Sequence, residues 1–258
     1  MLLLTIAENA HNNDGRITAY SRKFMKEDIC TIPINVVFEK KDGCPICRMR
    51  AELEERALDF VMGPAMMEPD VRHETNRLGF CPKHIEIMYG RGNKLPFALM
   101  LESHLIEINN TVFERHKKSL LRSTASQAAA SAKDARTMAE SCYVCARVEK
   151  AMNSEFETLW QMWKKEEEFR QSVADQPCIC ISDYAELIER GMKALDKKSF
   201  EEFYDVITKV AKKGLAELQS NVSGFCRMYD YRNNGEDFGN LRNAVKDAVS
   251  YLTGRMQK

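Results

Sequence analysis

The chain has 258 residues, of which 44% are hydrophobic and 29% charged, as in an ordinary globular protein with a substantial core. Lysine and arginine together number 38, as do aspartate and glutamate, so the zero net charge gives no strong signal for nucleic-acid binding. No apolar stretch approaches the roughly 18 residues of a membrane span, and residues 2–6 are too short for a signal peptide. We therefore expect a cytoplasmic protein without a membrane segment.

The N-terminal part of the chain differs from the rest. Residues 1–24 include an Asn-Asn-Asp-Gly stretch and show no helical periodicity, so we expect a peripheral extension and a functional chain that begins near Met25. The run from Thr31 to Phe38 is rich in β-branched residues and ends at a turn, which predicts a short extended segment. Helical spacing dominates everything that follows.

Three helices are predicted in the first half of the chain. One begins near Pro45, which suits a first turn, and ends at Gly63. A short helix opens at Pro69, and Gly79 can cap it. A long amphipathic helix carries apolar residues three or four positions apart, namely Phe97, Leu101, Leu105, Ile108 and Val112.

The second half follows a similar plan. Residues 119–140 are rich in alanine and serine, which is typical of a linker or a loosely packed helix. A helix with an apolar stripe then begins near residue 142, and a final helix is predicted close to the C-terminus. The expected fold is therefore mostly all-α.

Two pairs of metal-ligand motifs stand out. Cys44-Pro-Ile-Cys47 is followed by Cys81-Pro-Lys-His84, and Cys142-Tyr-Val-Cys145 is followed by Cys180-Ile-Ser-Asp183. A CxxC pair places two thiolates on one turn, and a second pair of ligands from another segment completes a tetrahedral site. We predict one site from the first pair of motifs and a second site from the other, with Cys178 as an alternative ligand in the second.

The motifs recur at a constant offset, which shifts by one residue after a single insertion and also relates Arg72 to Arg170 and Arg91 to Arg190. This pattern indicates an internal duplication into two tandem helical repeats, with a possible pseudo-two-fold relation. The predicted organisation is an extension at 1–24, a first repeat at 25–118, a linker or helix at 119–140 and a second repeat at 141–258.

Zinc is the predicted cofactor, as one or two ions. Three thiolates and one imidazole suit a closed structural zinc site, and an aspartate in place of the histidine is expected to weaken the second site. An iron–sulfur cluster is the alternative cofactor. A redox disulfide between the CxxC cysteines is also conceivable, but it would leave Cys81 and His84 without a role.

Two polar segments are candidates for a functional surface, and ion pairing between loops and helices is the competing explanation for both. The candidate residues are Glu68, Asp70, Arg72, Glu74, Asn76, Asp230 and Arg232. The sequence contains no phosphate-binding glycine loop, HExxH motif or nucleophile elbow, so catalytic residues remain unknown.

Several of these motifs together resemble an uncharacterised bacterial family known only as a domain of unknown function. The residues that carry the resemblance are Ile32-Pro-Ile-Asn35, Cys44–Cys47, Gly63–Arg72, Gly79–His84 and Asp230-Tyr-Arg232. The resemblance covers residues 28 to 254 and implies a helical protein with paired Cys/His units, but no established activity. Asp183 departs from the CxxH pattern of that family.

The leading hypothesis is a zinc-binding helical scaffold for binding or regulation, with structural metals and an unknown protein or small-molecule partner. The first alternative is a thiol or iron–sulfur redox protein or sensor. The second is an enzyme that uses the acidic and arginine-containing segment from Glu68 to Asn76. Neither the oligomeric state nor the partner can be deduced from the sequence.

Overall fold

The computed structural model describes residues 30–115, 123–229 and 239–256, and these contain eleven α-helices and no strand. The predicted all-α fold is confirmed. The helices are α1 (Ile32–Glu39), α2 (Pro45–Met62), α3 (Pro69–Leu78), α4 (Pro82–Gly90), α5 (Lys94–Ile108), α6 (Thr124–Glu140), α7 (Tyr143–Lys165), α8 (Glu167–Ala174), α9 (Ile181–Ala194), α10 (Lys197–Met228) and α11 (Ala244–Thr253). A π-helical turn at Asn109–Glu114 extends α5.

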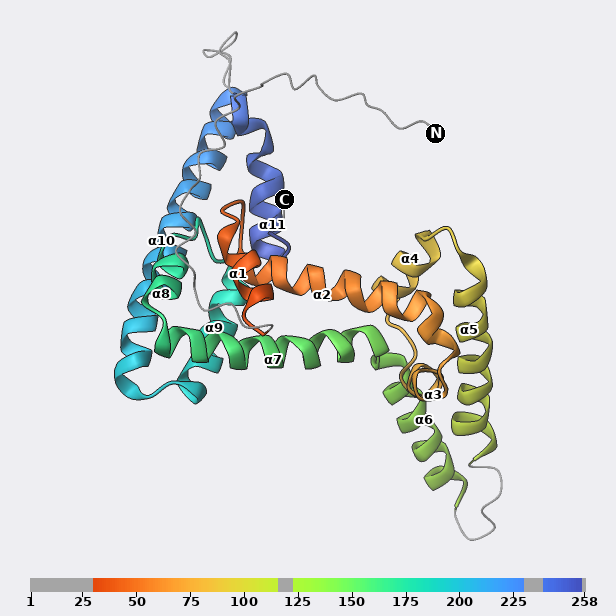
Figure 1. Cartoon of the computed structure of the whole chain (residues 1–258). Coiled ribbons are helices and arrows are strands. Elements are labelled where there is room, and N and C mark those ends of the chain that lie inside the picture. The colour runs from red at the N-terminus through yellow and green to blue at the C-terminus, as the bar shows by residue number, and fades with distance from the viewer. Residues whose placement is uncertain (1–29, 116–122, 230–238, 257–258) are drawn as a thin grey trace, which may run out of the picture.

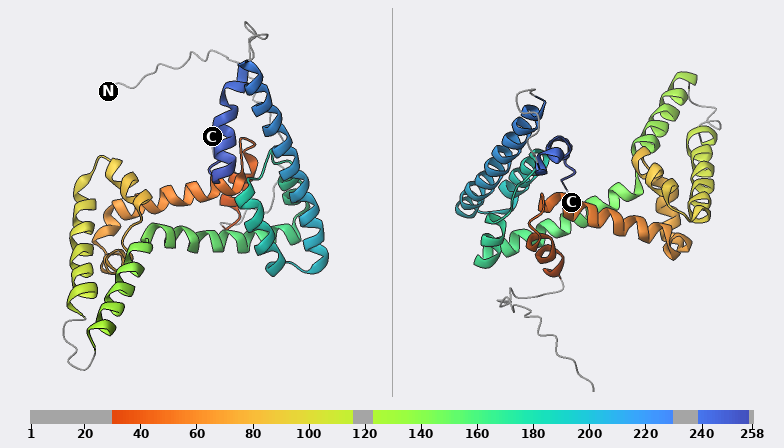
Figure 2. Two further views of the ribbon diagram at one scale, coloured as in Figure 1. Left: turned by 180° about the vertical axis from the view of Figure 1, so that it is seen from behind. Right: turned by 90° about the horizontal axis from the view of Figure 1, so that it is seen from above.

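The long helices α2 and α7 pack side by side in opposite directions and connect two groups of helices (Figures 1 and 2). Helices α3 to α6 lie at one end of this pair, where α2 ends and α7 begins. Helices α1 and α8 to α11 lie at the other end. Each end of the molecule therefore combines the start of one long helix with segments that follow the other.

The run from Thr31 to Phe38, predicted to be extended, instead forms most of the helix α1. α1 has Pro33 in its first turn, where the missing N–H costs nothing. Its buried side chains Ile34, Val37 and Phe38 are three to four residues apart, as on one helix face, and Phe38 packs edge-on against Phe169 of α8. Tertiary packing therefore outweighs the β-branched composition.

The predicted helix boundaries around the motifs agree closely with the structure. α2 begins at Pro45 and gives way to Gly63, while α3 begins at Pro69. Gly79 ends α3 with a φ of 57°, a left-handed conformation that glycine adopts without steric cost. α6 occupies most of the predicted linker but buries none of its side chains.

Aromatic packing holds α7 against α10 beyond the central pair. Trp163 and Phe203 meet edge-to-face with 5.0 Å between their ring centroids, and Trp160 approaches the same phenylalanine at 5.2 Å. This contact fixes the helical group that includes α9, whose start carries Cys180 and Asp183. None of the described helices is long and apolar enough to cross a membrane.

Candidate metal centres

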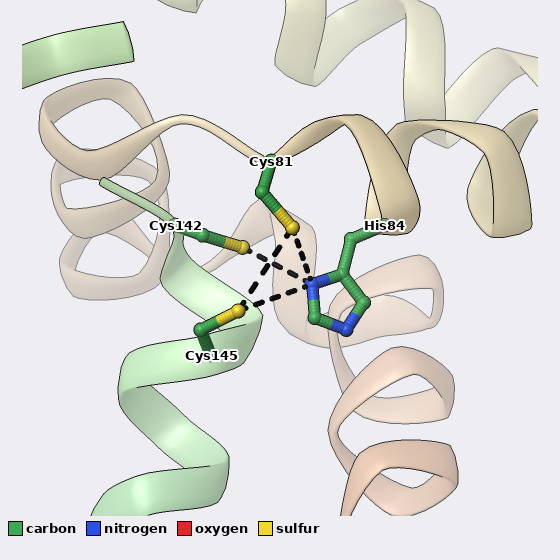
Figure 3. A group of neighbouring side chains, drawn as sticks. All are labelled: Cys81, His84, Cys142 and Cys145. Atoms are coloured by element: carbon green, nitrogen blue, oxygen red, sulfur yellow. Dashed lines mark hydrogen bonds between the residues drawn. The ribbon is translucent and has the colours of Figure 1, made fainter. Parts of the chain in front are cut away.

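The eight predicted ligands gather into two groups of four, and within each group the ligand atoms all lie within 4.8 Å of one another. The histidine cluster consists of Cys81, His84, Cys142 and Cys145 (Figure 3). The aspartate cluster consists of Cys44, Cys47, Cys180 and Asp183. The structure brings together every residue that the motifs nominated.

The predicted assignment of ligands to sites was wrong. Each cluster takes its CxxC pair from one half of the chain and its other two ligands from the other half. The reason lies in the packing of α4 on α2, which places His84 Nε2 2.9 Å from Glu54 Oε1. Glu54 is seven residues beyond Cys47, or about 10 Å along the helix. His84, which lies beside Glu54, is therefore too far from Cys47 for these two residues to bind the same ion.

All four motifs have the same local structure. The first cysteine of each motif is the N-cap of a helix: Cys44 for α2, Cys81 for α4, Cys142 for α7 and Cys180 for α9. The second ligand of each motif follows three residues later in the first turn, on the same face of the helix. Each cluster thus receives two helix N-termini, whose dipoles favour anionic thiolates.

In the histidine cluster, the imidazole nitrogen Nδ1 faces the sulfurs. It lies 3.2 Å from Cys81 Sγ, 3.2 Å from Cys142 Sγ and 3.5 Å from Cys145 Sγ. Figure 3 shows these side chains converging from the starts of α4 and α7. The opposite nitrogen, Nε2, contacts Glu54, which also pairs with Lys83.

In the aspartate cluster, one carboxylate oxygen faces all three sulfurs. Asp183 Oδ2 lies 3.0 Å from Cys47 Sγ, 3.1 Å from Cys180 Sγ and 3.2 Å from Cys44 Sγ. The other oxygen, Oδ1, lies 3.6 Å from the guanidinium of Arg50. Three thiolates, a carboxylate and a divalent ion leave two negative charges, so the Arg50 cation offsets part of the charge of a loaded site.

These separations suit a single tetrahedral ion. Zinc with Zn–S bonds of about 2.3 Å and Zn–N or Zn–O bonds of about 2.0 Å sets ligand atoms roughly 3.5 to 3.8 Å apart. The Sγ–Sγ distances agree with this spacing, at 3.9 Å for Cys81 and Cys145 and 3.5 Å for Cys47 and Cys180. The Nδ1–Sγ and Oδ2–Sγ distances of 3.0 to 3.5 Å would lengthen slightly around an ion. An iron–sulfur cluster is larger, because its ligands bind different iron atoms and point outward.

The two clusters differ sharply in burial. Cys44 and Cys180 are fully buried, and Cys47 and Asp183 are each 3% exposed. Residues after α11 cover this site, since the Cys44 N–H donates to the Met256 carbonyl at 3.2 Å. In the histidine cluster, by contrast, Cys81 is partly exposed and Cys145 exposed.

Cys178, the predicted alternative ligand, is not a member of either group of potential ligands. Its thiol lies 3.7 Å from the Met256 sulfur, and its Cβ faces Gly214 of α10. A Cβ at position 214 would lie 2.3 Å from that of Cys178, so only glycine permits this approach of α10 to the segment before Cys180.

The predicted polar surface is only partly assembled. Asp70 and Glu74 line a groove between α3 and α7, opposite Arg147 and Lys150. Glu74 also pairs with Arg77, while Arg72 forms no ion pair within the described residues. The Oδ1 atom of Asn76 is buried without a hydrogen-bond partner in this part of the chain.

Of the other candidates for that surface, Glu68 precedes α3 as its N-cap residue. Asp230 and Arg232 lie outside the described residues. The structure therefore brings no catalytic constellation together from this set within the described residues.

The sequence matches one protein family over residues 25–258, a family of unknown function designated DUF6062. The chain belongs to this family. The resemblance inferred from the cysteine motifs is thereby confirmed, and residues 1–24 lie outside the match. No curated protein and no solved structure matches the chain. The two clusters are therefore the features of this DUF6062 chain that bear most directly on its function.

Two residues beside the clusters were not predicted from the sequence. Arg50 lies one helical turn after Cys47, and that spacing could have indicated it. Glu54 carries no such signal, because its partner His84 comes from a distant segment. Such contacts to a ligating histidine fix the tautomer and the ring orientation.

Replacing Glu54 with glutamine is expected to weaken metal binding at the histidine cluster by about 10- to 100-fold. The carboxylate accepts the Nε2–H of His84, and this hydrogen bond lowers the pKa of Glu54 to about 2. Competition with a chromophoric zinc chelator measures the loss. The control is Glu52→Gln on the same helix, which removes only ion pairs with Lys40 and Arg56. Equal affinities for the two variants would contradict a role for Glu54.

Protonation of the ligands opposes metal binding at neutral pH. Burial alone would lower the pKa of His84, but hydrogen bonds to Cys142 and Glu54 raise it to about 10. Burial and the neighbouring Cys142 raise the pKa of Cys145 to about 12. The hydrogen bond from His84 overcomes burial and lowers the pKa of Cys142 to about 6. His84 and Cys145 therefore hold protons that an ion must displace.

The aspartate cluster behaves similarly. Burial raises the pKa of Cys44, and the hydrogen bond with Cys180 raises that of Cys47. Hydrogen bonds from Cys44 and Cys47 lower the pKa of Cys180. Burial and the charge of Cys180 raise the pKa of Asp183 to about 6. At pH 7, Cys180 and Asp183 are thus anionic before an ion binds, whereas Cys44 and Cys47 hold protons that an ion must displace.

Metal binding at pH 7 is therefore expected to release protons, and the affinity is expected to fall further as the pH drops below 6. Under those conditions Cys142 and Asp183 also become protonated and compete with the ion. Calorimetric titration in two buffers of different ionisation enthalpy measures the released protons. Identical heats in the two buffers would show that the ligands are already deprotonated.

Proposed function

We propose that this protein binds two zinc ions, one in each cluster, and that these ions are structural elements of a scaffold for binding or regulation. The observation that carries the proposal is the convergence, at two places, of three cysteines with one histidine or one aspartate, all ligand atoms of a group lying within 4.8 Å of one another. Thiolate-rich sets of this kind favour zinc among the divalent ions that lack redox chemistry.

The ligand sets support structural rather than catalytic ions. A catalytic zinc site keeps one position open for water or substrate, whereas each cluster here supplies all four tetrahedral ligands from the protein. Each ion would join the start of one long helix to a segment that follows the other. The metals would then act through the shape of the helical framework, and any partner would bind its surfaces.

A thiol or iron–sulfur redox protein is the competing function. The short distances between ligand atoms favour one ion per cluster, as argued above, but a mononuclear iron site has similar geometry. An enzyme that uses the groove between α3 and α7 is the other alternative. Asp70 and Glu74 on one wall and Arg147 and Lys150 on the other are the observation that favours it.

Elemental analysis of protein purified without oxygen, together with a visible spectrum, tests the proposal. The expected result is two zinc ions per chain and no absorption in the visible range. A single zinc ion per chain would restrict the proposal to one of the two clusters. If that ion is still present in the Cys180→Ala variant, the occupied site is the histidine cluster. Iron, with or without sulfide, and a coloured protein would overturn it in favour of the redox alternative.

A further inference from the structure

The two clusters differ in access to solvent, and this difference bears on their chemistry. Every ligand of the aspartate cluster is buried, with at most 3% of each residue exposed. In the histidine cluster, His84 and Cys142 are buried at 2% and 6% exposure, but Cys81 is partly exposed and Cys145 exposed. Oxidation of cysteine follows thiolate character and exposure, so Cys81 and Cys145 are the cluster cysteines that a dissolved oxidant approaches most readily.

We propose that Cys81 and Cys145 form a reversible oxidation site, at which a peroxide converts their thiolates to a disulfide and releases the zinc ion of the histidine cluster. The inference rests on the proposed two-zinc function and specifies how one of the sites is regulated. The aspartate cluster keeps its ion under the same conditions.

The position of the two sulfurs supports this pairing. Their Sγ atoms are 3.9 Å apart, and a disulfide requires about 2.05 Å, so a small movement suffices. Cys81 is the N-cap of α4 and Cys145 lies in the first turn of α7, so the new bond would join the same segments as the ion. The remaining ligands, His84 and Cys142, are too few to hold zinc tightly.

Other contacts keep the two cysteines adjacent when the ion leaves. The Tyr143 N–H donates to the Gly79 carbonyl at 2.9 Å, two residues before Cys81. The Ser141 hydroxyl donates to the Leu78 carbonyl at 2.8 Å. These bonds tie the start of α7 to the segment that leads into α4, and they involve none of the metal ligands.

The reaction balances with one peroxide per disulfide. The Cys145 sulfur, a thiolate while it is bound to zinc, attacks a peroxide oxygen and breaks the O–O bond, which gives a sulfenic acid and, after protonation, one water molecule. The Cys81 thiolate then attacks that sulfur, the S–O bond breaks, and hydroxide leaves to become a second water molecule. The two sulfurs supply the two electrons, the peroxide is reduced, and zinc is released as the divalent ion.

The test treats the zinc-loaded full chain with hydrogen peroxide beside a chromophoric zinc chelator, after metal analysis of the untreated protein. One of two zinc ions is expected to be released, and thiol reduction with added zinc should restore it. Peptide mapping without reduction should identify a Cys81–Cys145 disulfide and free thiols at Cys44, Cys47 and Cys180. Release of both ions at the same rate, or a disulfide elsewhere, would overturn the inference.

Cys145→His provides a variant that retains a possible ligand but lacks one of the two accessible thiols, so the proposed disulfide cannot form. Its zinc content is measured before treatment, and the ion that its histidine cluster holds is expected to stay bound at a peroxide dose that strips one ion from the natural chain. If this variant fails to fold, the peptide map of the natural chain still decides the question. Protein that contains no zinc before treatment would refute the proposed function as well, whereas two zinc ions that resist peroxide would overturn only this inference.

Discussion

Replacing Cys180 with alanine is expected to remove one zinc ion per chain and to lower the free energy of unfolding by several kcal/mol. Structural zinc in small domains contributes about 10–16 kcal/mol of binding free energy at pH 7, and a site that loses one of three thiolates keeps only part of it. Cys180 is fully buried and contacts Cys47 and Asp183, so solvent cannot readily supply the missing ligand. Metal analysis and chemical denaturation measure the two effects.

Cys178→Ala is the matched control, since this buried cysteine lies two residues away and outside both clusters. It should retain two zinc ions and lose on the order of 1 kcal/mol, from its packing against Gly214 and Met256. The pair of variants also decides between the two cysteines as ligands. Loss of an ion from Cys178→Ala but not from Cys180→Ala would show that Cys178, rather than Cys180, is the ligand.

Removal of both ions with a strong chelator in the presence of a thiol reductant is expected to abolish cooperative thermal unfolding. The whole stability of a domain is about 5–15 kcal/mol, which is comparable to the contribution of a single structural zinc ion. Both clusters lie against the single core that α2 and α7 share, so loss of both ions should loosen the core as a whole, even where hydrogen bonds still join neighbouring segments.

Circular dichroism during heating follows helix content, and tryptophan fluorescence follows the packing of Trp160 and Trp163 against Phe203. Chelator saturated with zinc is the control, and it should leave both signals unchanged. Added zinc should restore the transition. An unchanged transition in protein shown to be free of metal would mean that the clusters do not stabilise the fold.

Much of the local structure could be predicted because it depends on short-range signals. A proline in the first turn and a glycine after the last turn predicted the ends of α2 and α3 to within a residue or two. The CxxC and CxxH spacings located the residues that gather into the two clusters, because the N-cap and the third helical residue share a face. α1 was missed because its β-branched residues suggested a strand, and only its burial against α8 shows why it is a helix.

Which CxxC pair shares a cluster with which second motif could not be predicted. The spacing within a motif places its two residues on one helix face, but it does not determine which other motif packs beside them. The choice depends on where α4 and α9 pack along the long helices. Arg91 fixes α4 through Asp59 and Glu55 on α2, and Arg190 fixes α9 through Glu149 and Asn153 on α7. These contacts are consistent with the predicted duplication, which, like the domain boundaries, stays a prediction.

The exchange of ligands between the halves of the chain also sets an order of events during synthesis. The histidine cluster uses residues 81–84 and 142–145, so it lies wholly within the loop that the aspartate cluster closes. A ribosome releases its last ligand, Cys145, well before Asp183. Closing the inner loop first shortens the effective loop that remains, which lowers the entropic cost of the outer site. Until then Cys44 and Cys47 are without their partners, and a nascent chain halted before Cys180 would expose two thiols that the finished protein buries.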